Sequence, residues 1–170
     1  MESQASILIV GDHNDTLYAL ESALAPLDRP LVRATSGDEA LKQLLRGGIG
    51  LLLLDVRTPG ADSLDIVRYL RGPEQTQHIP VILLTGLDPD QELTAAADDL
   101  GVADLLVKPI DPRALRTKVR YLYDAHERHR ALKREISELR AARPRPSGLH
   151  DRSRPGRVPA PREIPRATSA

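Results

Sequence analysis

The sequence predicts a three-layer α/β domain in which helices cover both faces of a parallel β-sheet. Five short apolar runs predict the strands. Most of them are continuous rather than alternating, which is the pattern of strands buried on both faces of a sheet. These runs are Ile7–Val10, Leu31–Ala34, Leu51–Leu54, Val81–Leu84 and the weaker Leu105–Val107. Amphipathic segments separate them, so strand and helix alternate five times along the chain. This order is typical of a parallel sheet with right-handed crossovers.

The segments between the strands carry Leu and Ala at helical spacing. They are Thr16–Leu27, Gly37–Leu45, Leu64–Leu70 and Gln91–Leu100. Asp15 and Ser36 precede the first two segments. Their side-chain oxygens are expected to accept hydrogen bonds from the free N–H groups of the first helical turn. The sequence therefore predicts four crossover helices, two of them with an N-terminal cap.

The pattern changes after Pro112, where a much longer helix is predicted. Residues 113–142 contain neither Pro nor Gly, and eight positions follow an alternating spacing of three and four residues. These positions hold Leu115, Lys118, Leu122, Ala125, His129, Leu132, Ile136 and Leu139. A helix of this length extends roughly 45 Å, so we expect it to complete a domain over residues 1–122 and to project over residues 123–142. The projecting part is interpreted either as a coiled coil, with a homodimer through residues 125–139, or as a solvated helix.

Charge is distributed unevenly, although the whole chain has a formal net charge of zero. Residues 1–111 carry 8 basic and 18 acidic side chains, residues 112–142 carry 9 and 4, and residues 143–170 carry 7 and 2. The last segment also holds 6 of the 14 Pro residues, and we predict that it is disordered. Its Arg residues would support only weak, salt-dependent binding to nucleic acid. No motif for reading bases is present, so nucleic acid is not an expected partner.

Composition excludes several classes of function. The absence of Cys excludes disulfides, thiolate metal sites and cysteine nucleophiles. The longest apolar run, Ile49–Leu54, is far shorter than the roughly 20 residues that span a membrane. The N-terminus has no basic segment followed by an apolar one, so no secretory signal is predicted and the cytoplasm is the expected compartment.

Polar residues with distinct chemistry follow four of the predicted strands. Asp12 follows the first, Asp55 the third, Thr85 the fourth and Lys108 the fifth. Parallel sheets bind ligands at the carboxyl ends of their strands, so these side chains are expected to converge. Two carboxylates suit Mg²⁺, and a carboxylate beside Mg²⁺ can attack phosphorus to form an acyl phosphate. The ammonium and the hydroxyl would then hold the phosphoryl oxygens.

Four stretches of the chain resemble the receiver domain of two-component response regulators. They are ILIVGDHNDTLYALESAL, LLLLDVRTPGADSLDIVRYLR, HIPVILLTG and GVADLLVKPIDP, and with their spacing they cover about residues 5–120. The resemblance implies a flavodoxin-like (βα)5 sandwich with strand order 2-1-3-4-5, followed here by an extended C-terminal helix. It also implies a phospho-accepting signalling domain rather than an enzyme with a separate substrate.

The resemblance assigns roles to particular residues. Asp55 would accept the phosphoryl group from a sensor histidine kinase or a phosphotransfer protein. Asp12, Asp55 and the backbone carbonyl of Arg57 would hold Mg²⁺. Thr85 would supply the hydroxyl that moves toward the phosphoryl group and Lys108 the ammonium that contacts it, with Lys108-Pro109 as a cis peptide.

The chain also departs from the usual receiver pattern. Gly11 stands where receivers have the first of two adjacent acids, which predicts weaker Mg²⁺ binding. Leu105 replaces the aromatic residue that swings inward on activation, Ser63 replaces a glycine, and Arg57 places a long cation near the acceptor. Two interpretations follow: a working receiver with altered metal affinity and coupling, or a degenerate receiver that serves as a docking or dimerisation module. We favour the first, since Asp12, Asp55, Thr85 and Lys108 are all present.

Two further patterns carry less weight. The loop Gly11-Asp12-His13-Asn14-Asp15 has one glycine and two acids, which argues against the phosphate-binding loop of a nucleotide enzyme. None of the five His residues has a spacing typical of metal ligands. His126 and His129 share one helix face, which we interpret as solvated.

Overall fold

The five apolar runs form one parallel sheet in the predicted order, β2-β1-β3-β4-β5. The strands are β1 (Ser6–Val10), β2 (Leu31–Ala34), β3 (Ile49–Asp55), β4 (Val81–Thr85) and β5 (Asp104–Val107). The computed structural model describes residues 3–58, 60, 62–86 and 88–144. Apart from its first two residues, the segment predicted to be disordered therefore lies outside the described part of the chain.

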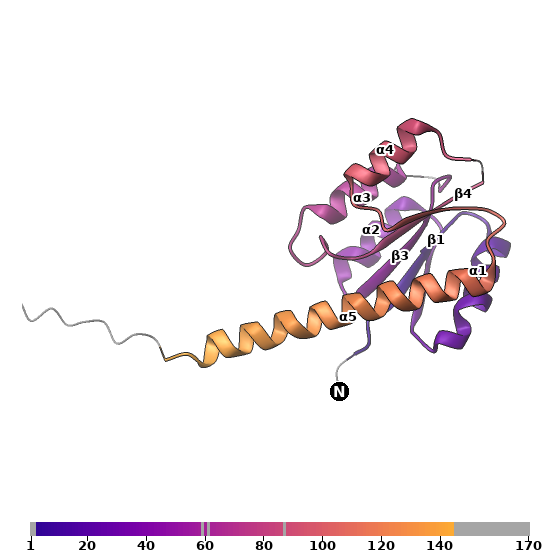
Figure 1. Cartoon of the computed structure of the whole chain (residues 1–170). Coiled ribbons are helices and arrows are strands. Elements are labelled where there is room, and N and C mark those ends of the chain that lie inside the picture. Colours follow the sequence, from indigo (N-terminus) through magenta and orange to yellow (C-terminus); the bar gives the residue numbers. More distant parts are fainter. Residues whose placement is uncertain (1–2, 59, 61, 87, 145–170) are drawn as a thin grey trace, which may run out of the picture.

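Helices cover both faces of the sheet (Figure 1). They are α1 (Asn14–Leu24), which continues into a 3-10 turn (Ala25–Leu27), α2 (Gly37–Arg46), α3 (Ser63–Arg71), α4 (Gln91–Asp99) and α5 (Pro112–Ala142). α1 and α5 pack on one face, and α2, α3 and α4 cover the other. Within the described residues, none of these helices combines the length and the apolar composition needed to cross a lipid bilayer.

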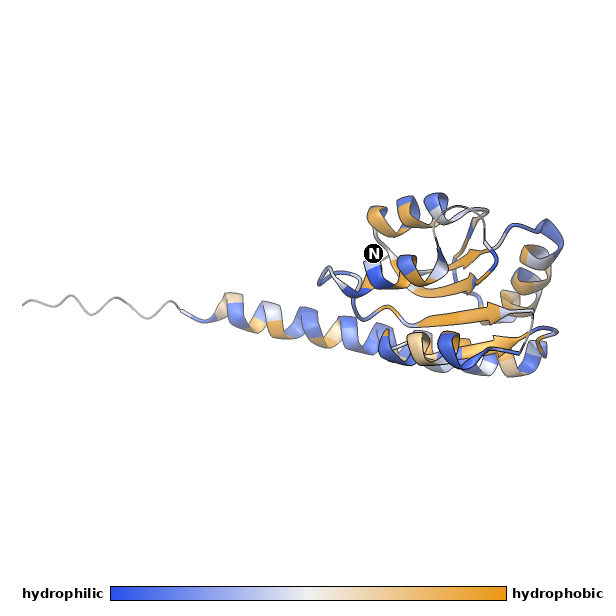
Figure 2. Cartoon of the chain, turned by 90° about the horizontal axis from the view of Figure 1, so that it is seen from above, coloured by the Kyte–Doolittle hydropathy of each residue, from blue (hydrophilic) through white to orange (hydrophobic). Residues whose placement is uncertain are grey.

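β3 lies at the centre of the sheet and every one of its residues is buried. Leu51 and Leu53 belong to the apolar cluster beneath α1 and α5. Leu52 and Leu54 belong to the cluster beneath α2, α3 and α4. Burial on both faces explains why this strand is a continuous apolar run, and Figure 2 shows that the strands of the sheet are largely hydrophobic.

The helix caps differ from the prediction at one of the two positions. Ser36 caps α2, because its hydroxyl accepts a hydrogen bond from the N–H of Glu39 at 3.2 Å. The prediction for Asp15 was wrong. α1 begins at Asn14, its N-cap is His13, and Asp15 lies within the first turn. There its negative charge still favours the positive end of the helix dipole.

α5 is anchored at its centre by Tyr123. The phenol oxygen of Tyr123 donates a hydrogen bond to the carbonyl of Ala5 at 2.5 Å, and the ring is almost fully buried. Gly50 makes this contact feasible, because a Cβ at Gly50 would lie 2.8 Å from Ala5 Cβ and 3.2 Å from Tyr123 Cε2. The glycine in the apolar run of β3 is therefore required by the docking of α5.

The projecting part of α5 begins later than predicted. We predicted a boundary at residue 122, but Tyr123 and His126 are both buried against the domain. From Ala131 to Ala142 every residue is exposed. Helical spacing alone did not reveal this, because it does not specify how far along a helix the neighbouring domain extends.

His126 and His129 are not on a solvated face, contrary to the prediction. Nδ1 of His126 lies 3.2 Å from the carbonyl oxygen of His78, in the loop between α3 and β4. The rings of His78 and His129 meet edge to face with centroids 4.5 Å apart. Burial lowers the pKa of His126 and also that of His78. Three imidazoles thus help to hold α5 against the base of the domain.

Replacement of Gly50 by Ala is expected to destabilise the domain by about 1–3 kcal/mol, because the added methyl group overpacks the contact with Ala5 and Tyr123. Urea unfolding followed by circular dichroism measures this loss. Gly72→Ala is a matched control, since a Cβ there would lie at an ordinary 3.6 Å from the carbonyl of Tyr69. Equal stability of the two variants would contradict the packing role of Gly50.

The stability of the domain is expected to fall as pH drops below about 6.5. Because the folded state lowers the pKa of His126, the unfolded chain binds more protons over the interval below the ordinary His value of 6.5. The contribution of neutral His126 to the free energy of unfolding is therefore complete above pH 6.5. It is lost as the pH falls below 6.5 and through the lowered pKa of the folded state. Urea unfolding at pH 7.5 and pH 5.5 measures the change. His126→Gln should reduce it and the exposed control His13→Gln should not, whereas an identical pH response in both variants would contradict the assignment.

Candidate functional site

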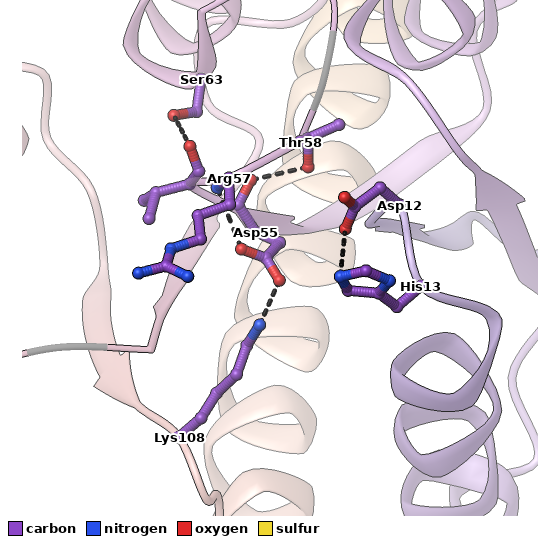
Figure 3. Close-up of polar contacts among 8 residues, drawn as sticks. Asp12, His13, Asp55, Arg57, Thr58, Ser63 and Lys108 are labelled. Atoms are coloured by element: carbon purple, nitrogen blue, oxygen red, sulfur yellow. Dashed lines mark hydrogen bonds and ion pairs between the residues drawn. The ribbon is translucent and has the colours of Figure 1, made fainter.

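Asp12, Asp55 and Lys108, three of the residues predicted from the strand ends, lie close together at one edge of the sheet (Figure 3). Asp55 ends β3 and Thr85 ends β4, while Asp12 follows β1 and Lys108 follows β5. The parallel register sets their level, since Asp55 pairs with Leu84. The N–H of Lys108 donates to the carbonyl of Thr85 at 2.8 Å. The sheet topology therefore brings together four residues that are up to 96 positions apart in the sequence.

Asp55 is a buried carboxylate, with only 3% of its surface exposed. Its Oδ2 is in contact with the ammonium of Lys108, and its Oδ1 accepts a hydrogen bond from the N–H of Arg57 at 3.0 Å. A buried charge is tolerated only when it is paired and hydrogen-bonded. The two contacts meet that requirement and leave both carboxylate oxygens oriented by specific donors.

Hydrogen bonds to the backbone carbonyls of Asp55 and Val56 hold the loop that follows Asp55. The hydroxyl and the N–H of Thr58 both donate to the carbonyl of Asp55, at 2.7 and 3.1 Å. The hydroxyl of Ser63 donates to the carbonyl of Val56 at 3.3 Å. Ser63 thus adds a tether at the position where receivers usually have glycine. The role of Thr58 could not be inferred from the sequence, because nothing in its spacing indicates that its hydroxyl turns back toward β3.

Gly60 closes this loop against α2. Its φ of +97° lies in the region that favours glycine, and a Cβ here would lie 3.3 Å from the backbone nitrogen of Gly37. The neighbouring Pro59, which belongs to the quoted receiver motif, lies outside the described residues. The Lys108-Pro109 peptide bond is cis, as predicted.

Asp12 lies beside Asp55, on the side away from Arg57 (Figure 3). Its carboxylate is partly exposed, and Oδ1 lies 3.6 Å from Nε2 of His13. The Asp12 and Asp55 carboxylates and the Arg57 carbonyl are hard oxygen donors of the kind that Mg²⁺ prefers. The chemistry of the residues present therefore fits Mg²⁺, with water completing the coordination.

Gly11 limits how many acidic side chains the site contains. Among the described residues, no group of three or more His, Cys, Asp or Glu side chains is arranged to hold a metal ion. A Cβ at Gly11 would lie 3.8 Å from Asp55 Cβ and 3.5 Å from Leu17 Cδ2, which are ordinary contacts. The backbone at position 11 therefore has space for a Cβ beside Asp55.

Thr85 and Leu105 occupy neighbouring strands but different environments. Thr85 is buried at the carboxyl end of β4, level with Val107 of β5. Leu105 packs against the apolar cluster beneath α2, α3 and α4. The position expected to hold a mobile aromatic ring therefore carries an aliphatic side chain that joins the core.

Comparison with known proteins agrees with this arrangement. The sequence matches the model of the response regulator receiver domain over residues 7–120. The chain belongs to the response regulator receiver family. The predicted fold and the resemblance to receiver domains are confirmed. The domain is a signalling receiver of two-component systems.

Individual relatives support the same family over most of this receiver. The cyclic di-GMP phosphodiesterase response regulator RpfG of Xanthomonas campestris is 35% identical over 136 residues, covering 79% of this chain and 36% of that protein. The response regulator PleD of Caulobacter vibrioides is 36% identical over 118 residues, covering 69% of this chain and 26% of that protein. This chain therefore spans about a third and a quarter of the length of these two relatives.

The fold also matches solved receivers. The signal receiver domain of an HD domain-containing protein from Pseudomonas fluorescens Pf-5 superposes with a TM-score of 0.66 and 28% identity. That match covers 73% of this chain and 98% of the other. The part of this chain that the match does not cover is about as long as the end of α5 together with the residues after it.

Replacement of Gly11 by Asp is expected to tighten Mg²⁺ binding by about ten- to a hundredfold, since it adds a carboxylate that the backbone accommodates beside Asp55. Isothermal titration with MgCl₂ measures the change. Gly11→Asn has nearly the same shape without the charge and should leave the affinity close to that of the natural chain. A similar gain in both variants would mean that charge at position 11 is not the limiting factor.

Proposed function

We propose that this cytoplasmic receiver accepts a phosphoryl group on Asp55 from a sensor histidine kinase or a phosphotransfer protein. The reaction depends on Mg²⁺, and the phosphorylated domain signals through protein–protein contacts. The observation that carries this proposal is the buried Asp55 carboxylate, held between the Lys108 ammonium and the Arg57 N–H at the carboxyl edge of the sheet. Membership of the receiver family supports it.

The proposed reaction is an in-line displacement at phosphorus. One carboxylate oxygen of Asp55 attacks the phosphorus atom of a phosphohistidine, the P–N bond breaks, and the electron pair leaves on the imidazole, which takes up a proton. The product is an acyl phosphate on Asp55. Bound Mg²⁺ would be held by Asp12, Asp55 and the Arg57 carbonyl, and it would offset the negative charge that builds on the phosphoryl oxygens.

Lys108 has a different partner before and after the transfer. In the unphosphorylated domain its ammonium neutralises the Asp55 carboxylate. Once Asp55 is an acyl phosphate, the same ammonium is within reach of a phosphoryl oxygen, and a charge-assisted hydrogen bond forms there. Thr85, on the adjoining strand end, would hold a second phosphoryl oxygen through its hydroxyl.

The signal must leave the site by a route that does not use an aromatic switch. Leu105 packs in the apolar core, so movement at Thr85 has no ring to draw inward. The carbonyl of Thr85 accepts a hydrogen bond from the N–H of Lys108. We propose that displacement of this strand pair is passed to α5 through the segment that follows Lys108.

A degenerate receiver is the second candidate, and Gly11 is the observation that favours it. The site would then hold two carboxylates, Asp12 and the acceptor Asp55 itself, where the usual receiver has three, so that metal binding is weaker and phosphorylation slower. In that case the domain would act as a docking or dimerisation module. Self-association through residues 125–139 belongs to both candidates, because it requires no phosphate.

Incubation with acetyl phosphate and MgCl₂ is expected to add one phosphoryl group to the chain, which intact-mass spectrometry detects. Asp55→Asn should abolish the adduct, because an amide oxygen is a far weaker nucleophile than a carboxylate. Asp62→Asn, at the exposed cap of α3, is a matched control and should leave it unchanged. Absence of an adduct on the natural chain would favour the degenerate receiver instead. An adduct that persists in Asp55→Asn would show that Asp55 is not the residue that accepts the phosphoryl group.

A further inference from the structure

The end of α5 exposes an apolar stripe that nothing in the described part of the chain covers. Leu132, Ile136 and Leu139 are 58%, 49% and 64% exposed. They lie in the stretch from Ala131 to Ala142 where every residue is exposed, and the helix leaves the domain there (Figures 1 and 2). Surface helices normally turn their large apolar side chains toward the core. Three such residues at a spacing of four and three indicate a second helix as the missing neighbour.

The stripe is accessible because it does not face the domain to which α5 belongs. The residues of α5 that are buried against the sheet are Leu115, Val119, Tyr123 and His126. At 100° per residue, the mean direction of Leu132, Ile136 and Leu139 lies about 130° around the helix axis from the mean direction of that buried set. A partner helix can therefore lie along the stripe without displacing the domain.

We propose that the stripe packs in parallel against the same stripe of a second copy of this chain. The inference rests on the self-association proposed above and adds its orientation and register. In the repeat of α5, Ile136 occupies an a position and Leu132 and Leu139 occupy d positions. A β-branched residue at a with Leu at d favours two parallel strands. Ile136 then faces Ile136 of the second copy.

The charges beside the stripe distinguish the two orientations. Glu135 is at a g position and Arg140 at the following e position, so in a parallel pair each Glu135 faces Arg140 of the other copy. An antiparallel pair that stacks Leu132 on Ile136 would bring Glu135 opposite Glu135 and Lys133 opposite Lys133. One that stacks Ile136 on Leu139 would bring Lys133 opposite Arg140. Glu135, Lys133 and Arg140 are all exposed. Opposite charges therefore meet only in the parallel arrangement.

The contact is limited to the outer part of α5. Toward the domain, a parallel pair would place Arg128 opposite Lys133, which carry like charges. Lys133 is already drawn to its own domain, where Nζ lies 3.5 Å from Oε1 of Glu74. His129, the preceding a position, packs on His78. The coil therefore begins at Leu132, and three apolar layers make a reversible rather than a permanent dimer.

Cysteine cross-linking of the full chain tests the orientation, because the natural chain contains no Cys. Under mild oxidation Ile136→Cys is expected to form a disulfide dimer, since the two positions face each other in the parallel pair. Glu138→Cys, on the other side of the helix, is the matched control and should remain largely monomeric. A mixture of Leu132→Cys and Ile136→Cys should give only 132–132 and 136–136 links. A predominant 132–136 link would show an antiparallel pair and overturn the proposed orientation while leaving self-association intact.

Sedimentation equilibrium of the full chain tests the contact itself. The natural chain should show a reversible dimer, and Ile136→Asp should abolish it. Glu135→Arg should raise the dimer dissociation constant about fivefold or more, because it replaces two attractive pairs by two repulsive ones. Glu135→Arg with Arg140→Glu should restore it, and the control Glu138→Arg should not change it. The proposal would be overturned if the natural chain had a monomeric mass at protein concentrations up to several hundred micromolar. It would also be overturned if Ile136→Asp did not affect the dimer. Phosphorylation of Asp55 is measured separately by mass and is expected to be unchanged in Ile136→Asp, so the two failures are distinguishable.

Discussion

A charged carboxylate at the end of an otherwise apolar, fully buried strand is the constraint on which this structure depends. Asp55 follows six buried residues of β3 and is itself almost inaccessible to solvent. A lone charge in that place would be costly, and the cost is offset by the ammonium of Lys108 and the N–H of Arg57. Lys108 follows β5, which lies two strands from β3 in the sheet, and from there its side chain reaches Asp55. The strand order therefore sets where the partner of the carboxylate lies.

The same helix serves the core and the exterior. The first part of α5 buries Leu115, Val119 and Tyr123 against the sheet, and Gly50 provides the space that Tyr123 needs. The last part continues past the domain with Leu132, Ile136 and Leu139 exposed. The helix is continuous between these parts, so a change in how it docks would move the exposed stripe. The histidine contacts at His78, His126 and His129 lie at the junction of the two parts.

The departures from the usual receiver pattern have separate structural consequences. Gly11 removes a carboxylate without altering the backbone, because a side chain would fit there. Ser63 adds a hydrogen bond to Val56 and so stiffens the loop beside the acceptor. Leu105 joins the apolar core and contributes packing in place of a mobile ring. The first change concerns metal affinity, the second concerns the loop, and the third concerns how a change at the site reaches the rest of the domain.

Much of the fold was determined by the sequence alone. Apolar runs predicted all five strands, and helical spacing predicted the helices between them. The runs are continuous in β3 and β4, which are buried throughout, whereas the edge strands β2 and β5 are only partly buried. The positions of Asp12, Asp55, Thr85 and Lys108 at strand ends predicted that they would meet at one edge. The tertiary structure decided which side of each helix packs against the sheet and over how many residues. It buried His126 against His78 and exposed Leu132, although both lie on one regular helix. It also turned Thr58 toward the carbonyl of Asp55. The burial of His126 depends on a contact between residues 48 positions apart, which local spacing does not record. The Thr58 contact is local, but it depends on the conformation of the loop after β3, which spacing does not specify.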